Sequence, residues 1–117
     1  MKTTFLILSA LVAIEHIYFL VLEMFYWTKP KGMKAFGQSK EQAESSKVLA
    51  ANQGLYNGFL AAGLIWGLLA DKSDVMIYFL ICVVIAGIYG SYSTKMIKLF
   101  YVQAVPALLA LGIWLLS

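Results

Sequence analysis

The residue types best suited to chemistry are three ionisable side chains in an otherwise apolar stretch, residues 3–27. They are Glu15, His16 and Glu23. With 3.6 residues per helical turn, all three lie within a sector of about 100°. Ionisable groups at membrane depth are costly when they face lipid, so they usually face a bundle interior or water and mark routes for protons, ions or ligands. We expect this sector to be internal, with Glu15 and His16 at the floor of a cavity open to the cytoplasm.

Uncharged polar side chains form a second set in the stretch 48–70. Its members are Asn52, Gln53, Tyr56 and Asn57. Hydrogen bonding between helices would explain one such residue, at about 0.6–2 kcal/mol per contact in membranes. Four of them on adjacent helical stripes exceed what helix association requires. We expect a ligand or ion site formed with Glu23 and His16.

Two further apolar stretches, residues 75–94 and 99–116, also carry polar side chains at one end. These are Tyr89, Ser91, Tyr92 and Ser93 in the first, and Tyr101 and Gln103 in the second. In the topology expected below, these ends lie on the cytoplasmic side. We expect Tyr89, Tyr92 and Gln103 to join the ligand-binding site.

Small residues at four-residue spacing indicate where helices approach closely. Two such ridges are present, Ala50, Gly54, Gly58 and Ala62 in one stretch and Ala86, Gly90 and Thr94 in the next. Small residues let two backbones pack tightly in lipid. The ridges are therefore predicted helix-packing surfaces, and the first could instead assemble a homo-oligomer.

Structural explanations of the ionisable residues stay open. Glu23 and His16 could form a buried pair that satisfies itself. Glu15 could be a structural acid kept neutral by burial. A zinc or di-iron centre needs three or four nitrogen, sulfur or carboxylate ligands, and the apolar stretches embed one histidine and two glutamates. We expect neither a metal site nor a cofactor.

Composition sets the fold class. Of the 117 residues, 62% are hydrophobic and 13% charged, and the mean hydropathy is +0.80. Soluble domains are roughly half apolar and a quarter charged. We predict an all-α membrane protein, one domain of four transmembrane helices in an antiparallel bundle, at about residues 3–27, 48–70, 75–94 and 99–116. Pro106 predicts a kink in the last helix. A signal peptide is the alternative for the first stretch, although no Ala-x-Ala cleavage site follows it.

The lysines predict orientation. The loop 28–47 carries five of the nine lysines, and the chain has no arginine. Positively charged loops stay in the cytoplasm. We expect a multi-pass protein of the bacterial plasma membrane with this loop cytoplasmic and both termini outside. The positive charge suits phospholipid head groups rather than nucleic acid.

The same loop carries signals for local structure. Pro30, Gly32 and Gly37 are expected to break helix early. Ser39 with Gln42 three residues later has the form of a capping box. We expect a short helix from about Lys40 that runs into the second transmembrane helix or lies at the surface just before it.

Two strings carry a resemblance to a known family, HIYFLVLEMFYW at residues 16–27 and KVLAANQGLYNGFLAAG at residues 47–63. They resemble the small bacterial membrane proteins grouped as domain of unknown function 1304, and the resemblance runs the length of the chain. It implies a four-helix membrane protein and brings no established activity.

Three functions fit these patterns. The first is binding or transport of a small polar or cationic solute or a proton in the cytoplasm-facing cavity. The second is an enzyme acting on a lipophilic substrate, with Glu23, His16 and Tyr56 or Tyr92 as acid and base candidates, against which the absence of arginine counts. The third is an accessory subunit whose ridges dock a partner helix. We favour binding or transport, and we lean against an enzyme.

Overall fold

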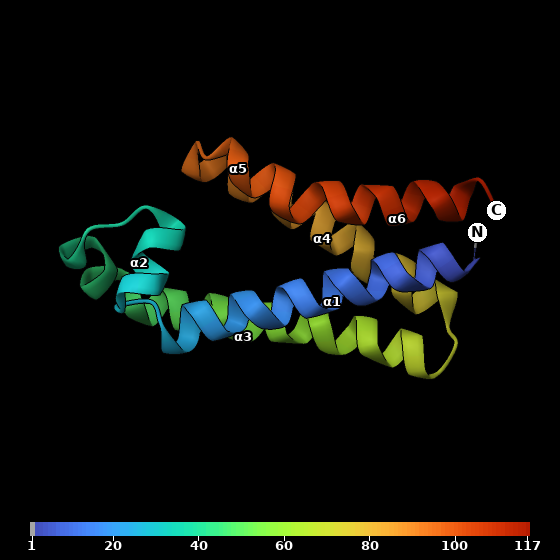
Figure 1. Ribbon diagram of the computed structural model, residues 1–117, viewed down its shortest axis with the longest axis horizontal. Coiled ribbons are helices and arrows are strands. Elements are labelled where there is room, and N and C mark those ends of the chain that lie inside the picture. The colour runs from blue at the N-terminus through green and yellow to red at the C-terminus, as the bar shows by residue number, and fades with distance from the viewer. Residues whose placement is uncertain (1) are drawn as a thin grey trace. The chain divides into compact units, whose positions relative to one another are not determined.

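A computed structural model describes residues 2–117, and every element within that range is helical (Figure 1). In chain order the elements are α1 (Lys2–Phe25), α2 (Pro30–Phe36), α3 (Lys40–Leu69), α4 (Ser73–Thr94), α5 (Ile97–Leu99), the π-helix η1 (Phe100–Ala104) and α6 (Val105–Leu115).

Three helical stretches are long and apolar enough to cross a membrane. They are Lys2–Phe25, Ser73–Thr94 and Ile97–Leu115, the last combining α5, η1 and α6. The predicted all-helical class is confirmed, but the count of four spans is not. The remaining long helix, α3, combines a charged first part with amides at Asn52, Gln53 and Asn57, which lower its hydropathy.

The chain divides into two compact units. The first consists of residues 2–14 and Leu60–Ser117. Its core follows a stripe of α4 with steps of four, three and four residues, Met76, Leu80, Val83 and Gly87. Small residues of α6, Ala107 and Ala110, are fully buried in the same core, and the rings of Phe5 and Trp114 lie 5.1 Å apart. Large residues on α4 thus fill the space that alanines on α6 leave.

The stretch before Pro106 is a π-helix, η1, rather than a simple kink. Proline has no N–H to donate to the carbonyl of Val102, and its ring clashes with that carbonyl. A turn with hydrogen bonds between residues five apart relieves the clash. The wider turn sets Ala104 and Gln103 against Gly87 of α4, where an added Cβ would lie 3.0 Å from that of Ala104.

The second unit, Glu15–Phe59, combines the end of α1, the short helix α2 and the first two-thirds of α3. The expectation that Pro30, Gly32 and Gly37 break helix was wrong for Pro30 and Gly32, which lie within α2, and correct for Gly37, which follows its last residue. Pro30 begins this helix, where its missing N–H costs nothing, and Gly37 ends it in the left-handed conformation at φ 63°. Gly32 lies inside the helix. Its position favours glycine, because an added Cβ would meet the carbonyl oxygen of Tyr26.

The capping box is confirmed. The Ser39 backbone N–H donates to Gln42 Oε1 at 3.0 Å, and the Gln42 N–H donates to Ser39 Oγ at 3.2 Å. The predicted short helix from Lys40 forms the first turns of α3 itself, which continues to Leu69 without a break.

Candidate functional site

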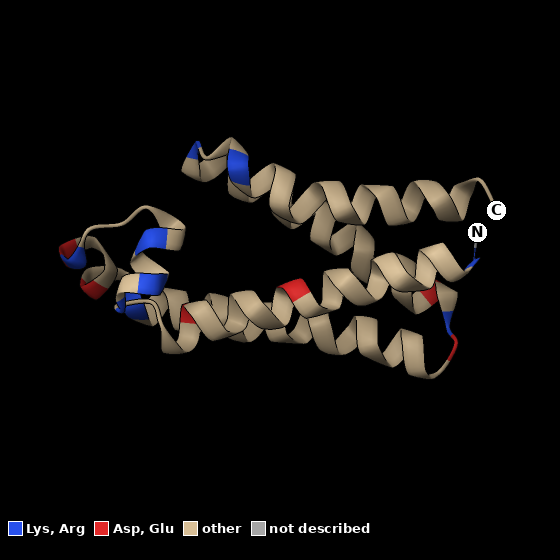
Figure 2. Cartoon of the chain, in the orientation of Figure 1, with Lys and Arg blue, Asp and Glu red and all other residues tan. Residues whose placement is uncertain are grey.

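A carboxylate and an amide from two helices meet inside the second unit. Glu23 on α1 is 7% exposed and Asn57 on α3 is 3% exposed. Asn57 Nδ2 donates a hydrogen bond to Glu23 Oε1 at 2.5 Å. Glu23 and Glu15 are the acidic residues of α1, which otherwise carries one lysine, Lys2, at its start (Figure 2). Buried charges require partners, so this contact fixes the pairing of α1 with α3.

Glycines on α3 allow the pairing. A Cβ at Gly54 would lie 2.6 Å from Met24 Cγ and 3.1 Å from Glu23 Cβ, and one at Gly58 would lie 2.7 Å from a methyl group of Leu20. Real Cβ atoms essentially never lie closer than 3.0 Å to another atom, so a side chain at either position would force Met24, Leu20 or the helices themselves to shift. Two members of the first predicted ridge, Gly54 and Gly58, thus pack within the chain against α1.

An open pocket of about 380 Å³ lies beside the carboxylate. Its lining comes from the end of α1, the following turn and α3, and consists of Glu23, Met24, Phe25, Trp27, Thr28, Lys47, Val48, Ala51 and Asn52. Five of these nine side chains are apolar or aromatic, and four are polar or charged. An apolar wall with a small number of polar groups is the usual composition of a small-molecule site.

Trp27 holds one wall of the pocket in place. Its Nε1 donates to Ser46 Oγ at 3.1 Å, and the ring centroids of Trp27 and Phe36 lie 4.8 Å apart. Ser46 Oγ in turn donates to the carbonyl of Gln42 at 2.7 Å. The indole therefore ties the α1–α2 turn to α2 and to the first turns of α3.

The other predicted ligand residues of this unit lie in different environments. Asn52 lines the pocket, whereas Gln53 and Tyr56 are exposed on other faces of α3. His16 is fully buried, with its ring 5.3 Å from that of Phe19 in edge-to-face contact. Glu15 is half-buried, and within residues 2–117 its Oε1 accepts no hydrogen bond.

The predicted site residues Tyr89, Tyr92 and Gln103 belong to the first unit. Both tyrosines are exposed, and Gln103 is half-buried with its Cβ near Gly87. The structure therefore brings Glu23, Asn57 and Asn52 together and places these three residues in the other unit.

The predicted packing ridges follow the structure only in part. Ala50 and Gly54 are buried, but Ala62 is exposed. The buried stripe of α3 instead alternates steps of four and three residues, Ala50, Gly54, Asn57, Ala61 and Leu64. Residues spaced four apart rotate by about 40° round the helix at each step. After two or three turns such residues no longer face the neighbouring helix.

The second ridge departs for the same reason. Ala86 is exposed, and a Cβ added to Gly90 would meet nothing within 4 Å. Gly87, one residue away, makes the close contact with Ala104.

Several pocket residues were not predicted as site residues. They include Met24, Phe25, Trp27 and Thr28. Their position directly after Glu23 in the chain could have identified them, since residues in a turn that follows a buried carboxylate stay near it.

Among the described residues, no group of three or more His, Cys, Asp or Glu side chains could hold a metal ion.

These features define an all-helical protein with helices of membrane-spanning length and a buried carboxylate–amide pair. The chain belongs to the family described as Protein of unknown function (DUF1304), whose model matches residues 10–115. It is 36% identical over 110 residues to the "Uncharacterized protein YpaA" of Lactococcus lactis subsp. lactis (strain IL1403), covering 91% of this chain and 92% of that relative. No solved structure matches the chain.

Proposed function

We propose that this protein is an integral membrane protein that binds a small cationic solute at Glu23. The observation that carries the proposal is a buried carboxylate, bonded to Asn57 on one oxygen, at the wall of an open pocket. A carboxylate removed from water needs more than one neutral donor to offset its desolvation. A cation in the pocket would supply that compensation.

The rest of the lining supports an organic cation of small size. A volume of about 380 Å³ is at the low end of the range for small-molecule pockets. Phe25 and Trp27 offer aromatic surface to an ammonium or alkylammonium group, and the Asn52 amide adds a polar contact. Lys47 also lines the pocket, but its ammonium lies 3.4 Å from a Glu44 carboxylate oxygen. That carboxylate already offsets its charge.

Binding fits the arrangement better than catalysis. A reaction on a lipophilic substrate would need an acid and a base in one place. The pocket lining contains Glu23 but neither His16 nor Tyr56. The same pocket could load a solute or proton for transport, with the fourth span supplied by the apolar part of α3.

Calorimetric titration of the protein in lipid nanodiscs with methylammonium and tetramethylammonium chloride tests the proposal. We expect saturable binding to the wild type and a loss of affinity of at least about tenfold in Glu23→Gln, since one charge-assisted contact is worth about 1.5–3 kcal/mol.

The matched control is Glu15→Gln, the same substitution on the same helix at a residue outside the pocket lining. It should bind as the wild type does. No saturable binding to the wild type, or equal loss in both variants, would contradict the proposal.

A further inference from the structure

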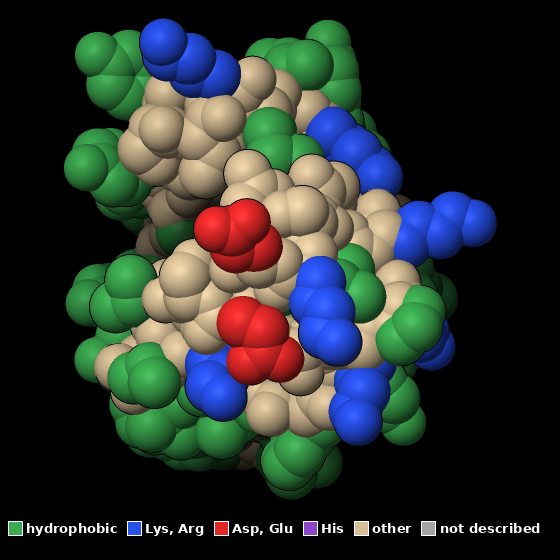
Figure 3. Space-filling model, turned by 90° about the vertical axis from the view of Figure 1, so that its left-hand side faces the viewer, with side chains coloured by type: hydrophobic (Ala, Val, Ile, Leu, Met, Phe, Trp, Pro, Cys, Tyr) green, Lys and Arg blue, Asp and Glu red, His purple; other side chains and the backbone are tan. Residues whose placement is uncertain are grey.

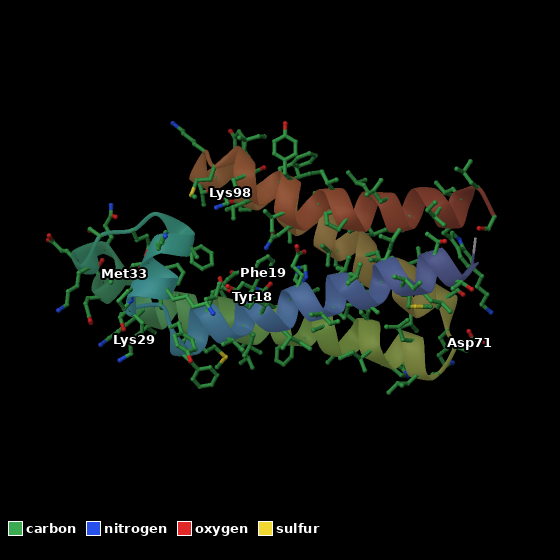
Figure 4. All side chains as sticks on the ribbon, viewed as in Figure 1. Tyr18, Phe19, Lys29, Met33, Asp71 and Lys98 are labelled. Atoms are coloured by element: carbon green, nitrogen blue, oxygen red, sulfur yellow. The ribbon has the colours of Figure 1, made fainter. Side chains whose placement is uncertain are left out.

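One exposed lysine of the second unit lies over two aromatic rings. Lys31 of α2 places its Nζ 5.5 Å from the ring centroid of Tyr18 and 5.9 Å from that of Tyr26. Tyr18 lies on α1, and Lys29, just before α2, and Met33, within it, mark the position of the short helix (Figure 4). An ammonium within about 6 Å of a ring face is attracted to it.

The fold fixes this lysine at its place. The Lys29 N–H donates to the Tyr26 carbonyl at 3.0 Å, and the Met33 N–H donates to the Lys29 carbonyl at 3.0 Å. Gly32 packs against the same Tyr26 carbonyl, and the Phe36 ring packs on Trp27. These contacts fix the position of α2 beside the end of α1, and the Lys31 ammonium lies near Tyr18 and Tyr26 from that position.

The ammonium therefore lies beside the last two turns of α1. Tyr18 lies about two turns, or about 10 Å, before the end of α1 at Phe25, and α1 is one of the stretches able to span a membrane. Tyr18 is 46% exposed and Tyr26 is 42% exposed, so both tyrosine side chains are accessible from outside the protein. Within residues 2–117 the ion pairs are Lys2 with Asp71 and Lys47 with Glu44, so Lys31 lacks a carboxylate partner.

We propose that Lys31, Tyr18 and Tyr26 form a binding site for the head group of an anionic phospholipid. The lipid phosphate would lie on the ammonium, and the tyrosine hydroxyls would donate to phosphate or glycerol oxygens while the rings contact the upper acyl chains. A cation held at the membrane interface without a protein carboxylate is complementary to anionic lipid. Aromatic residues with a polar end suit the head-group region.

The neighbouring lysines differ from Lys31. Lys29, Lys34 and Lys40 are exposed at the end of the unit where the acidic residues Glu41 and Glu44 also lie, and blue and red side chains are interspersed on that face (Figure 3). They contribute a general attraction to a charged membrane surface. Lys31 alone among them is over tyrosine rings, so the site predicts a position-specific effect.

Native mass spectrometry of the detergent-purified protein with added phosphatidylglycerol or phosphatidylcholine tests this site. We expect discrete phosphatidylglycerol adducts on the wild type and few phosphatidylcholine adducts. Lys31→Gln should weaken phosphatidylglycerol binding on the order of fivefold, the effect of one interfacial lysine.

Lys34→Gln removes the same charge from the same helix, but from a lysine for which no tyrosine ring contact is found in residues 2–117, and should change binding by less than about twofold. Tyr18→Leu should weaken binding while it leaves the net charge unchanged, and circular dichroism shows whether each variant retains its helix content. Equal losses in Lys31→Gln and Lys34→Gln would overturn the site in favour of general charge attraction. Full competition by inorganic phosphate would overturn the lipid as the ligand.

Discussion

At the scale of single residues, the Asn57–Glu23 contact combines structure and function. The amide holds one carboxylate oxygen, and the pocket lies beside the same side chain. A hydrogen bond to a charged group is stronger than a neutral one, and it fixes the carboxylate at one place in the wall. Loss of either partner should therefore change both stability and binding.

Asn57→Leu should destabilise the protein by about 1–3 kcal/mol, because the buried Glu23 carboxylate would lose its donor. Thermal unfolding in detergent, followed by circular dichroism, measures the change. Gln53→Leu removes a neighbouring amide that is exposed and should leave the melting temperature nearly unchanged. An Asn57→Leu variant as stable as the wild type would contradict the role of this contact.

The sequence predicted part of this site and could not predict the rest. It placed Glu23 and Asn57 on polar sectors of two neighbouring helices, where the structure joins them. It could not separate Asn57 from Gln53 and Tyr56, because helical periodicity gives the angle between stripes but not which stripe a neighbouring helix covers. Which stripe of α3 is covered depends on where Gly54 and Gly58 allow α1 to approach.

Among the helices, α1 and α3 pair closely because Gly54 and Gly58 of α3 have no side chain to keep α1 at a distance. A Cβ at Gly54 would lie 2.6 Å from Met24 Cγ. Gly54→Leu should separate the helices and break the Asn57–Glu23 contact, at a cost of several kcal/mol.

Unfolding in sodium dodecyl sulfate measures the loss. Gly90→Ala is the control, because an added Cβ there meets nothing within 4 Å, and it should be neutral or stabilising by about 0.5–1 kcal/mol. Equal destabilisation by both substitutions would contradict the close approach at Gly54.

The first turn of α3 depends on its capping box. Ser39→Ala removes the acceptor of the Gln42 N–H and should weaken this turn by about 1 kcal/mol. Hydrogen exchange by mass spectrometry should show faster exchange in residues 40–46. Ser45→Ala, at an exposed serine within the helix, is the control, and unchanged exchange in Ser39→Ala would contradict the capping role.

Element boundaries show what local sequence signals can predict. Ser39 and Gln42 predicted the start of α3 correctly, because a capping box involves only neighbouring residues. The expectation for Pro30 was wrong because proline both stops helices and begins them. The expectation for Gly32 was wrong because this glycine contacts Tyr26 in the preceding turn, and the types of the adjacent residues do not reveal that contact. For the same reason the sequence could not show that Gly87 packs closely against Ala104 whereas Gly90 has no such contact.

At the scale of the whole molecule, the number of spans decides the topology. Three stretches qualify by length and hydropathy, and the proposed function uses the apolar part of α3 as a fourth. The polar residues that lower the hydropathy of α3 include Asn57, whose amide is bonded to Glu23 and hidden from lipid. An even number of spans places both termini on one side, and an odd number places them on opposite sides.

Single cysteines at Thr3, Gln38 and Ser117, in a Cys82→Ser background, test this topology with a membrane-impermeant maleimide on intact cells. We expect Thr3→Cys and Ser117→Cys to be labelled, and Gln38→Cys to be labelled only after the membrane is opened. Labelling of only one terminus on intact cells would contradict a fourth span.

Chemical modification of Glu23 in the reconstituted protein tests directly whether a cation binds at this carboxylate. Dicyclohexylcarbodiimide enters membranes and couples to carboxyl groups, and peptide mass spectrometry locates the adduct. We predict that tetramethylammonium lowers modification of Glu23 and leaves that of Glu15, outside the pocket lining, unchanged. Modification of Glu23 that the cation does not alter would contradict a cation site at this carboxylate.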